Sequence, residues 1–494
     1  MAEEKEKSQN IILAMKFKVD ANKAGTHLLN KFGAASRTYW NWQVERQSNR
    51  WLTHVERHEQ WVEDGYEKHL EDLKEKMEND LATDVYKEKS DEHKAAQKEI
   101  RRASFQMLDL AQGDREFRKL RNSEDEKFNW IKQTSSRIIG GQYKRLNTSY
   151  TEGRKKRKVH GFWKKGDFKK PLKGLPRFRS WRDNQYFDCE AHQIKWDWEK
   201  SRLRLPVSKA STWIKFNQHI EMKDIMEKYP KAKLGMCVFT RTPTLKWYVF
   251  IPIDTGVPVP EKLDFDESNT VGIDVGIKNY ITLSDPSEIN NPDFLEKFKL
   301  EYSNEKLSPY KTDKKLLRRK KIRQRRLSKK ESKSKNYEKQ RLICAKLDEK
   351  IANKRDDFTH ELSRALVDMP FNAFAVEDLD IAQMKRKKAP IKGKDGKFKR
   401  NGRVQQRGMN RQINDVAWGS FFTKFKYKSD YAGKSMIRID RFEPSSKKCG
   451  CGSINDDLKL SQRMWECPEC GVVNDRDKLA AMNIKNYVLG GKND

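Results

Sequence analysis

The spacing of hydrophobic and polar residues changes several times along the chain, and each change marks a predicted element. Residues 11–19 alternate apolar and polar side chains, which predicts a short first strand. From about residue 21 to residue 142, apolar residues recur at steps of three and four with Glu and Lys on the opposite face. This spacing is typical of helices that pack on one another. The cationic run Arg154–Lys158 interrupts the pattern and is expected to open a Gly- and Lys-rich connection that reaches about Arg179.

The next part of the chain is typical of strands. Between residues 185 and 253, short runs alternate with a period of two and are separated by frequent turns, which predicts a small antiparallel barrel. The Pro- and acid-rich stretch 257–261 predicts a linker. Residues 271–280 then alternate apolar and small side chains around one carboxylate, Asp274, as expected of a buried strand. Tyr280–Leu283 predicts the returning strand of a hairpin.

A long basic helix is predicted downstream. Residues 314–330 carry eleven cations in seventeen positions, and the helix is expected to continue to Leu366 and to end before Pro370. A second apolar strand, 374–379, then leads into Glu377. Residues 385–411 are rich in Gly, Lys and Arg and predict a mobile basic loop, which is followed by a helix over 413–431 and a strand over 436–439.

Charge indicates the kind of partner. The 494 residues include 105 Lys and Arg against 72 Asp and Glu, a formal net charge of +33. This excess predicts a polyanionic ligand whose binding weakens as the salt concentration rises. The longest apolar run, Asn10–Met15, is far too short to span a membrane, and the acidic start Met1–Lys5 is unlike a signal peptide. We therefore expect two to four domains of a cytoplasmic protein that binds no membrane.

Four of the seven cysteines form two close pairs, Cys449 with Cys451 and Cys467 with Cys470. Two thiolate pairs joined by a short loop suit tetrahedral Zn²⁺, and four cysteine ligands leave no open position for catalysis. The sequence therefore predicts a structural zinc site in a reducing compartment rather than disulfides. Because Cys-x-Cys is tighter than the usual first pair, a lost site or free thiols remain the alternatives.

A third acidic segment follows the cysteines. Asp477 lies at the start of a helix rich in small residues, two positions after Asp475, whose simplest role is to cap that helix. Carboxylates suit Mg²⁺, and two such ions can support in-line displacement at a phosphodiester. Asp274, Glu377 and Asp477 are therefore candidate ligands for two Mg²⁺ ions, and their spacing leaves open whether they converge.

Dense cations and interleaved aromatic residues are the predicted nucleic-acid contacts. The segment 314–330 repels itself unless phosphates neutralise it, and Trp residues among Arg and Lys are typical of stacking on unpaired bases. The simpler interpretation of each cation is a solvated surface charge. The candidates are Trp40, Trp42, Arg154, Lys155, Lys156, Arg157, Lys314, Lys315, Arg318, Arg319, Arg323, Arg326, Arg411 and Arg463.

Four motifs occur in order: Gly-Ile-Asp-Val-Gly-Ile-Lys, Val-Glu-Asp-Leu, Ser-Ser-Lys-Lys-Cys and Asp-Arg-Asp-Lys-Leu-Ala-Ala-Met-Asn-Ile. With the paired cysteines they resemble TnpB, the transposon-encoded RNA-guided nuclease, and equally the miniature type V CRISPR effectors derived from it. The resemblance covers residues 266–488. It implies an α+β multidomain protein with an RNase H-like (RuvC) mixed-sheet nuclease domain that carries a zinc-binding insertion. A small β-barrel (wedge) domain, interrupted by a helical recognition lobe, would precede it.

Carried onto this sequence, the resemblance implies a catalytic triad of Asp274, Glu377 and Asp477. Two departures from the family pattern are Leu479, which stands where Asn is usual, and the first cysteine pair, which is one residue short. The expected domains are residues 1–20, the first strand of the wedge barrel; 21–149, the recognition lobe; 150–265, the wedge barrel; 266–444, the first part of the nuclease domain; 445–473, the zinc-binding insertion; and 474–494, the last part of the nuclease domain.

The expected function is RNA-guided DNA cleavage that depends on Mg²⁺, with guide RNA and target double-stranded DNA as partners and a prokaryotic or phage source. A nuclease-inactive RNA-guided repressor and a protein-guided transposon nuclease are the alternatives. The oligomeric state, a monomer or a homodimer on one RNA, stays open.

Overall fold

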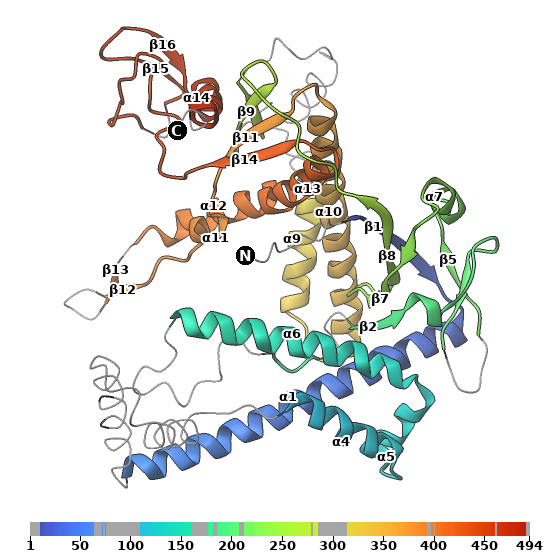
Figure 1. Ribbon diagram of the computed structural model, residues 1–494. Coiled ribbons are helices and arrows are strands. Elements are labelled where there is room, and N and C mark those ends of the chain that lie inside the picture. Colours follow the sequence, from blue (N-terminus) through green and yellow to red (C-terminus); the bar gives the residue numbers. More distant parts are fainter. Residues whose placement is uncertain are drawn as a thin grey trace, which may run out of the picture. The chain divides into compact units, whose positions relative to one another are not determined.

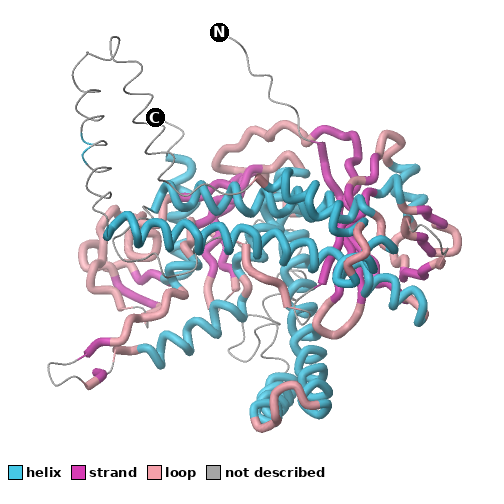
Figure 2. The backbone as a smooth tube through the Cα atoms, turned by 90° about the horizontal axis from the view of Figure 1, so that it is seen from below, coloured by secondary structure: helices cyan, strands magenta, loops and turns pink. Residues whose placement is uncertain are grey.

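Figure 1 shows the computed structural model of the chain, and the structure describes residues 10–63, 72, 75, 109–160, 176–180, 185–206, 212–277, 280–284, 314–392, 397–399, 401–459 and 462–490. Two compact units make up the chain, one of residues Ile12–Gly256 and one of Val257–Asp494 together with Met1–Ile11. Figure 2 shows how helices, strands and loops are distributed along the same backbone.

The first unit contains an eight-stranded curled sheet in the order β2-β7-β8-β1-β5-β4-β3, with β6 paired to β8. Alternate residues of its strands, such as Val249 and Ile251 of β8, are fully buried in one hydrophobic core. The strands are β1 (Asn10–Asp20), β2 (Gln185–Glu190), β3 (Lys195–Asp197), β4 (Arg202–Arg204), β5 (Ile214–Asn217), β6 (Lys233–Leu234), β7 (Met236–Arg241) and β8 (Trp247–Pro258). The predicted first strand and the predicted period of two are therefore observed.

Two details of this unit differ from the prediction. Over the described residues the hydrogen-bonded path ends at β2 and β3, so no ladder closes the sheet into a barrel there. Strand β8 also continues to Pro258, so the first two residues of the predicted linker 257–261 belong to the strand.

The helices of the first unit are α1 (Lys23–Glu63), α4 (Leu110–Asn122), α5 (Glu126–Asn129), η2 (Trp130–Gln133), α6 (Ser136–His160), η3 (Ala191–Gln193) and α7 (Met222–Lys228). The prediction that Arg154–Lys158 interrupts the helical pattern is wrong, because α6 runs through this segment to His160. Lys and Arg are good helix formers, and charge density alone does not end a helix without Gly or Pro. Within the helical segment predicted over 21–142, residues 64–108 lie outside the described residues, apart from residues 72 and 75.

The second unit is organised around a mixed four-stranded sheet in the order β10-β9-β11-β14. Its strands are β9 (Thr270–Val275), β10 (Ile281–Leu283), β11 (Ala373–Glu377) and β14 (Ser435–Ile439). The pairs β9–β11 and β11–β14 are parallel, whereas β10 returns antiparallel to β9 with Thr282 opposite Asp274. The predicted strands and the predicted hairpin are thus present, although its turn residues 278–279 lie outside the described part of the chain.

Helices cover both faces of this sheet (Figure 1). The buried side chains of Ile273, Phe374 and Val376 pack with residues of α10 (Lys335–Asp368) and α13 (Trp418–Tyr431) in one core. On the other face, Ala375 and Ile439 pack with Ile484 and Val488 of α14 (Arg476–Gly490). Alternate residues of each strand therefore face different helices.

The predicted helix over 314–366 is two helices, α9 (Lys314–Ser328) and α10. The chain reverses at Lys333, whose φ is 74°, and the Ser334 hydroxyl then caps α10 by accepting a hydrogen bond from the Tyr337 amide at 3.1 Å. The C-terminal end was predicted correctly, because α10 stops at Asp368 before Met369-Pro370.

The region predicted as a mobile basic loop, 385–411, is partly regular. It follows directly on α11 (Ile381–Met384) and contains a hairpin of β12 (Ile391–Lys392) and β13 (Phe398–Lys399) and most of α12 (Arg403–Val416). The single helix predicted over 413–431 is broken at Ala417, whose φ of 55° and ψ of 35° separate α12 from α13. The spacing of apolar residues does not reveal that a single alanine adopts the left-handed backbone conformation.

Gly272 of β9 lies directly against the backbone of α14. A Cβ at this residue would lie 1.9 Å from the Ala481 carbonyl oxygen and 2.8 Å from the Lys485 amide nitrogen. Both are backbone atoms, so the contact cannot relax by rotating a side chain. We therefore expect Gly272→Ala to lower the free energy of unfolding by about 3 kcal/mol or more.

Thermal and urea unfolding test this expectation, with Gly408→Ala as the matched control. A Cβ at Gly408, within α12, meets no atom within 4 Å, so that substitution is expected to be neutral or to stabilise by about 1 kcal/mol. Equal stabilities of the two variants would contradict the observed packing of α14 on β9.

Candidate active site and metal centre

Asp274 and Glu377 lie at the carboxyl ends of the adjacent parallel strands β9 and β11. The register pairs Ile273 with Val376, so the two acids are the next residue on each strand. Gly272, two residues before Asp274, abuts α14, and Ala375, two residues before Glu377, packs against the same helix. By the alternation of strand side chains, both acids belong to the face of the sheet that α14 covers.

Asp477 joins them from the first turn of α14. The helix begins at Arg476, and the Asp475 carboxylate caps it by accepting hydrogen bonds from the amides of Asp477 at 3.0 Å and Lys478 at 3.1 Å. The capping role expected of Asp475 is therefore observed. The Asp477 side chain is not used by the cap and is 13% exposed.

The negative charges of the other two acids both act on Asp274. The pKa of Asp274 is raised to about 7, mainly by burial and then by the negative charges of Asp477 and Glu377, while Arg476 and Arg463 oppose the shift. Burial also raises the pKa of Glu377, with a smaller contribution from Asp378. Such a concentration of mutually repelling carboxylates is costly without a bound cation and is typical of a site that binds one.

Arginines hold the third acid in place. Arg463 Nη1 donates to both carboxylate oxygens of Asp477, at 2.6 and 2.5 Å, and Arg476 Nη2 donates at 3.2 Å. Arg463 was predicted to contact nucleic acid, but here its guanidinium is paired with Asp477. The role of Arg476 was missed because a residue in a helical first turn carries no sequence signal for its contacts.

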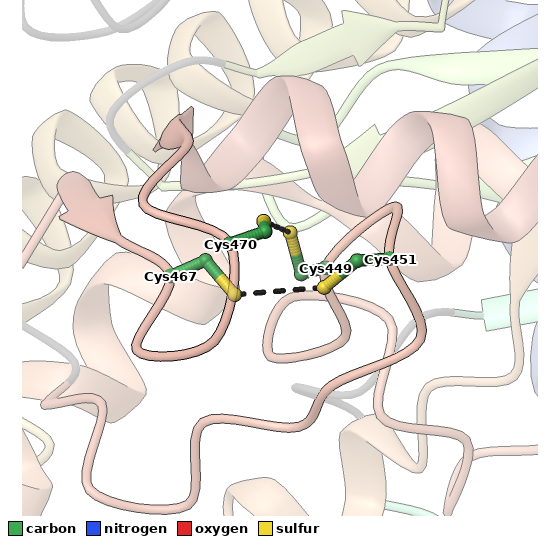
Figure 3. A group of neighbouring side chains, drawn as sticks. All are labelled: Cys449, Cys451, Cys467 and Cys470. Carbon is green, nitrogen blue, oxygen red and sulfur yellow. Dashed lines mark hydrogen bonds between the residues drawn. The ribbon is translucent and has the colours of Figure 1, made fainter.

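The four predicted cysteines converge in one cluster (Figure 3). Their Sγ atoms all lie within 4.8 Å of one another, with Cys449 3.7 Å from Cys470 and Cys451 3.6 Å from Cys467. A tetrahedron with Zn–S bonds of about 2.3 Å has S–S edges of about 3.8 Å, so the observed spacing fits four thiolates around one ion. The Cys-x-Cys pair, although short, thus places its sulfurs as required.

Local hydrogen bonds favour the thiolate at Cys449 and Cys467, whereas the pKa of Cys470 is raised to about 12. A bond from the Cys451 backbone lowers the pKa of Cys449 to about 6, and the Asn474 amide donates to the Cys449 sulfur at 3.5 Å. A bond from the Cys470 backbone likewise lowers the pKa of Cys467. These are the groups that a metal ion would bind as anions.

The cysteine cluster is directly joined to the acidic site. Strand β15 (Met464–Glu466) pairs antiparallel with β16 (Val473–Asp475), which leads into α14. Leu479, the departure from the family pattern, is 7% exposed and packs with Trp465, Cys449 and Cys467. Its side chain thus packs α14 against the cysteine-bearing hairpins.

Most of the cations that were predicted to contact nucleic acid, and whose side chains the structure describes, are exposed. Helix α9 presents the exposed side chains of Lys315, Arg318, Arg319 and Arg326, with Arg323 half-buried, and Arg411 is exposed on α12. The side chains of Arg154, Lys155, Lys156, Arg157 and Lys314 lie outside the described part of the structure, although their backbones are helical.

The two candidate tryptophans, Trp40 and Trp42, both pack against other side chains of the protein. Trp40 is 6% exposed, its indole N–H donates to the Arg177 carbonyl at 2.8 Å, and the Arg179 guanidinium carbon lies 3.2 Å from its ring centre. Trp42 packs edge-on against Phe117 at 5.3 Å. The prediction that Trp40 stacks on a base is therefore not supported, because its ring is already covered.

No helix among the described residues is long and apolar enough to cross a membrane.

Comparisons with known proteins agree with the motifs. Residues 251–388 match the family model described as "Probable transposase", and residues 418–484 match the model described as "Cas12f1-like, TNB domain". A Streptomyces pristinaespiralis protein named "Putative RNA-guided DNA endonuclease" is 32% identical over 48% of this chain and 49% of its own length. The Escherichia coli K12 protein "Putative RNA-guided DNA endonuclease InsQ" is 25% identical over 72% of this chain and 75% of its own.

Among solved structures, a Cas12f1–sgRNA–target DNA complex aligns over 97% of this chain and 99% of that one, at 13% identity and a TM-score of 0.44, too low to establish a shared fold. The chain spans about half the length of the Streptomyces relative. The sequence matches confirm the predicted resemblance to transposon-encoded RNA-guided nucleases and to Cas12f1-like effectors.

Proposed function

We propose that this chain is an RNA-guided DNA endonuclease whose single catalytic centre is formed by Asp274, Glu377 and Asp477. The observation that supports the proposal is that the negative charges of Asp477 and Glu377 both act on the pKa of Asp274, although up to 203 residues separate these acids in the sequence. Two of the relatives carry the name "Putative RNA-guided DNA endonuclease", which supports the same conclusion.

The donor set fits Mg²⁺, because three carboxylates on a partly buried surface offer only hard oxygen ligands. When bound, such ions would lower the pKa of an attacking water and stabilise the leaving 3′ oxygen of the phosphodiester. The elements of the chain position the three acids. The parallel pair β9–β11 fixes two of the acids on one face of the sheet, and the capped N-terminus of α14 fixes the third.

The four cysteines fit a structural Zn²⁺. Each pair lies in the turn of one hairpin, and the sulfur spacing suits one tetrahedral ion. Because β16 continues directly into α14, a metal held there would fix the register of Asp477 and the position of Arg463 beside it.

Guide RNA and target DNA are the proposed partners. The exposed cations of α9 and α12 provide a surface for phosphate contacts, and such contacts position a duplex without reading its sequence. Sequence would be read by pairing between the RNA and the DNA, as in other guided nucleases.

The raised pKa of Asp274 predicts a pH-dependent requirement for magnesium. Below about pH 7 this carboxyl is protonated in the metal-free protein, so a metal ion must displace the proton. The Mg²⁺ concentration that gives half-maximal cleavage is expected to rise about tenfold for each pH unit below 7 and to level off above it. Cleavage measured against Mg²⁺ concentration from pH 5.5 to 8.5 tests this, and an unchanged requirement at pH 6 and pH 8 would contradict it.

The RNA-binding part of the proposal is tested by expressing the chain with its flanking genomic DNA and sequencing the RNA that copurifies. A discrete structured RNA with one variable end is the expected result. Sequence-specific cutting by RNA-free protein would instead support a protein-guided nuclease. A discrete RNA with tight target binding and no cutting would support a repressor.

A further inference from the structure

The ion pair between Arg463 and Asp477 uses the same oxygen atoms that a metal ion at Asp477 would need. Arg463 Nη1 lies 2.6 Å from Oδ1 and 2.5 Å from Oδ2, so one nitrogen bridges the open edge of the carboxylate. Arg476 Nη2 donates to Oδ1 as well, at 3.2 Å. A carboxylate offers about four acceptor positions, and these three contacts use most of them.

A metal ion and the Arg463 guanidinium therefore exclude each other at this carboxylate. Hard cations bind carboxylates through their oxygen atoms, and the bridging nitrogen already lies between the two oxygens of Asp477. Two positive groups so close together on a mostly buried acid would also repel each other. Binding of Mg²⁺ to this edge of Asp477 thus requires that the guanidinium leaves it.

The arginine is the partner that is able to move. Its side chain is 40% exposed, whereas that of Asp477 is 13% exposed. The backbone of Arg463 is held, because its carbonyl accepts a hydrogen bond from the Arg476 amide at 2.8 Å and the next residue begins β15. Rotation of the Arg463 side chain into solvent therefore breaks the pair without moving the strand or the helix.

The charge of Arg463 also reaches a second proposed ligand. Arg476 and Arg463 are the two groups that lower the pKa of Asp274 against the effects of burial and of the other acids. Arg463 thus offsets part of the negative charge of the centre. The same charge weakens the attraction of the centre for a metal ion.

We propose that the Arg463–Asp477 ion pair is an autoinhibitory contact, in which the guanidinium competes with Mg²⁺ for Asp477 and keeps the metal affinity of the centre low until the side chain rotates away. The inference rests on the proposed function, because it concerns the same centre, and it adds a control on metal loading. Arg463 acts on the metal site through Asp477.

Competition and simple support of Asp477 predict opposite effects of removing the guanidinium. If Arg463 only held Asp477 in place, Arg463→Ala would weaken metal binding. Under competition, Arg463→Ala should bind the metal about tenfold tighter or more, because binding no longer requires breaking charge-assisted hydrogen bonds. Arg463→Gln, which keeps a long polar side chain without the charge, should change in the same direction.

Titration of the full chain with Mn²⁺, without nucleic acid, tests this. Mn²⁺ favours the same oxygen ligands as Mg²⁺, and its free concentration is measured by electron paramagnetic resonance. Arg441→Ala is the matched control, because its side chain is also 40% exposed and pairs with Asp378 and Asp380, which are not proposed ligands. Its affinity should be nearly unchanged. Mn²⁺ should also raise the melting temperature of Arg463→Ala more than that of the unsubstituted protein.

Equal or weaker Mn²⁺ binding by both Arg463 variants would overturn the inference, and so would equal tightening in Arg441→Ala. Failure of the proposed function gives a different pattern, which Asp274→Ala reveals. If the three acids form the metal site, Asp274→Ala weakens Mn²⁺ binding whatever the role of Arg463. Binding that Asp274→Ala leaves unchanged would overturn the proposed centre and the inference with it.

Discussion

Replacing Asp274 with alanine is expected to slow RNA-guided DNA cleavage at least about a thousandfold while RNA binding stays unchanged. Metal ions at such a centre supply several kcal/mol of transition-state stabilisation, and each 1.4 kcal/mol corresponds to about tenfold in rate. The charges of Asp477 and Glu377 both affect the pKa of Asp274. Removing the Asp274 carboxylate is therefore expected to disrupt the proposed metal site. Single-turnover cleavage and RNA retention, measured on the same preparation, test this.

The helix start provides a matched control for the triad. Asp477→Asn is expected to abolish cleavage like Asp274→Ala, whereas Asp475→Asn should keep most of the activity. Asn caps helices about as well as Asp, so that variant preserves the two amide hydrogen bonds and removes only a nearby charge. Greater loss in Asp475→Asn than in Asp477→Asn would reverse the assignment of the third acid.

Replacing Cys467 with serine is expected to release the bound metal, to unfold the cysteine-bearing hairpins and to abolish cleavage. Small zinc modules draw ~10 kcal/mol or more of folding free energy from their ion, and Cys467 is one of its four proposed ligands. Loss of these hairpins would free Leu479 and remove Arg463 from Asp477. Metal content per chain should fall from about one Zn²⁺ to nearly none.

Cys344→Ser is the control for this second prediction. Cys344 is also buried, at 5% exposure, but it lies on α10 outside the cysteine cluster. It should keep its zinc and its activity. The same zinc content in both variants, measured by atomic emission after gel filtration, would contradict the assignment of the four ligands.

The sequence was sufficient to predict the elements whose side chains must be apolar because they are buried. The strands that carry Asp274 and Glu377 are apolar runs, and burial on both faces of a mixed sheet produces such runs. The cysteine cluster was equally accessible, because metal ligation requires fixed residue types at short spacing. The N-terminal cap at Asp475 followed from its place before a small-residue helix.

Breaks within helical sequence were not predictable, because they depend on single residues. Lys333 and Ala417 adopt positive φ without being Gly or Asn, and each divides a periodic segment into two helices. Long cationic segments caused the opposite error. Their charge density indicated loops, but the helices α6 and α12 run through them. The covered ring of Trp40 and the pairing of Arg463 with Asp477 are tertiary contacts that composition cannot distinguish from nucleic-acid contacts.

The measurement that tests the central claim most directly is cleavage by protein carrying a reprogrammed RNA. The variable end of the copurifying RNA would be rewritten to match a chosen sequence in a plasmid library with a randomised flank, and the ends of the cut DNA would be sequenced. We expect the cut to move with the rewritten sequence, to require Mg²⁺ and one short flanking motif, and to vanish in Asp274→Ala. A cut that stays in place when the RNA is rewritten, or that persists in Asp274→Ala, would contradict the account.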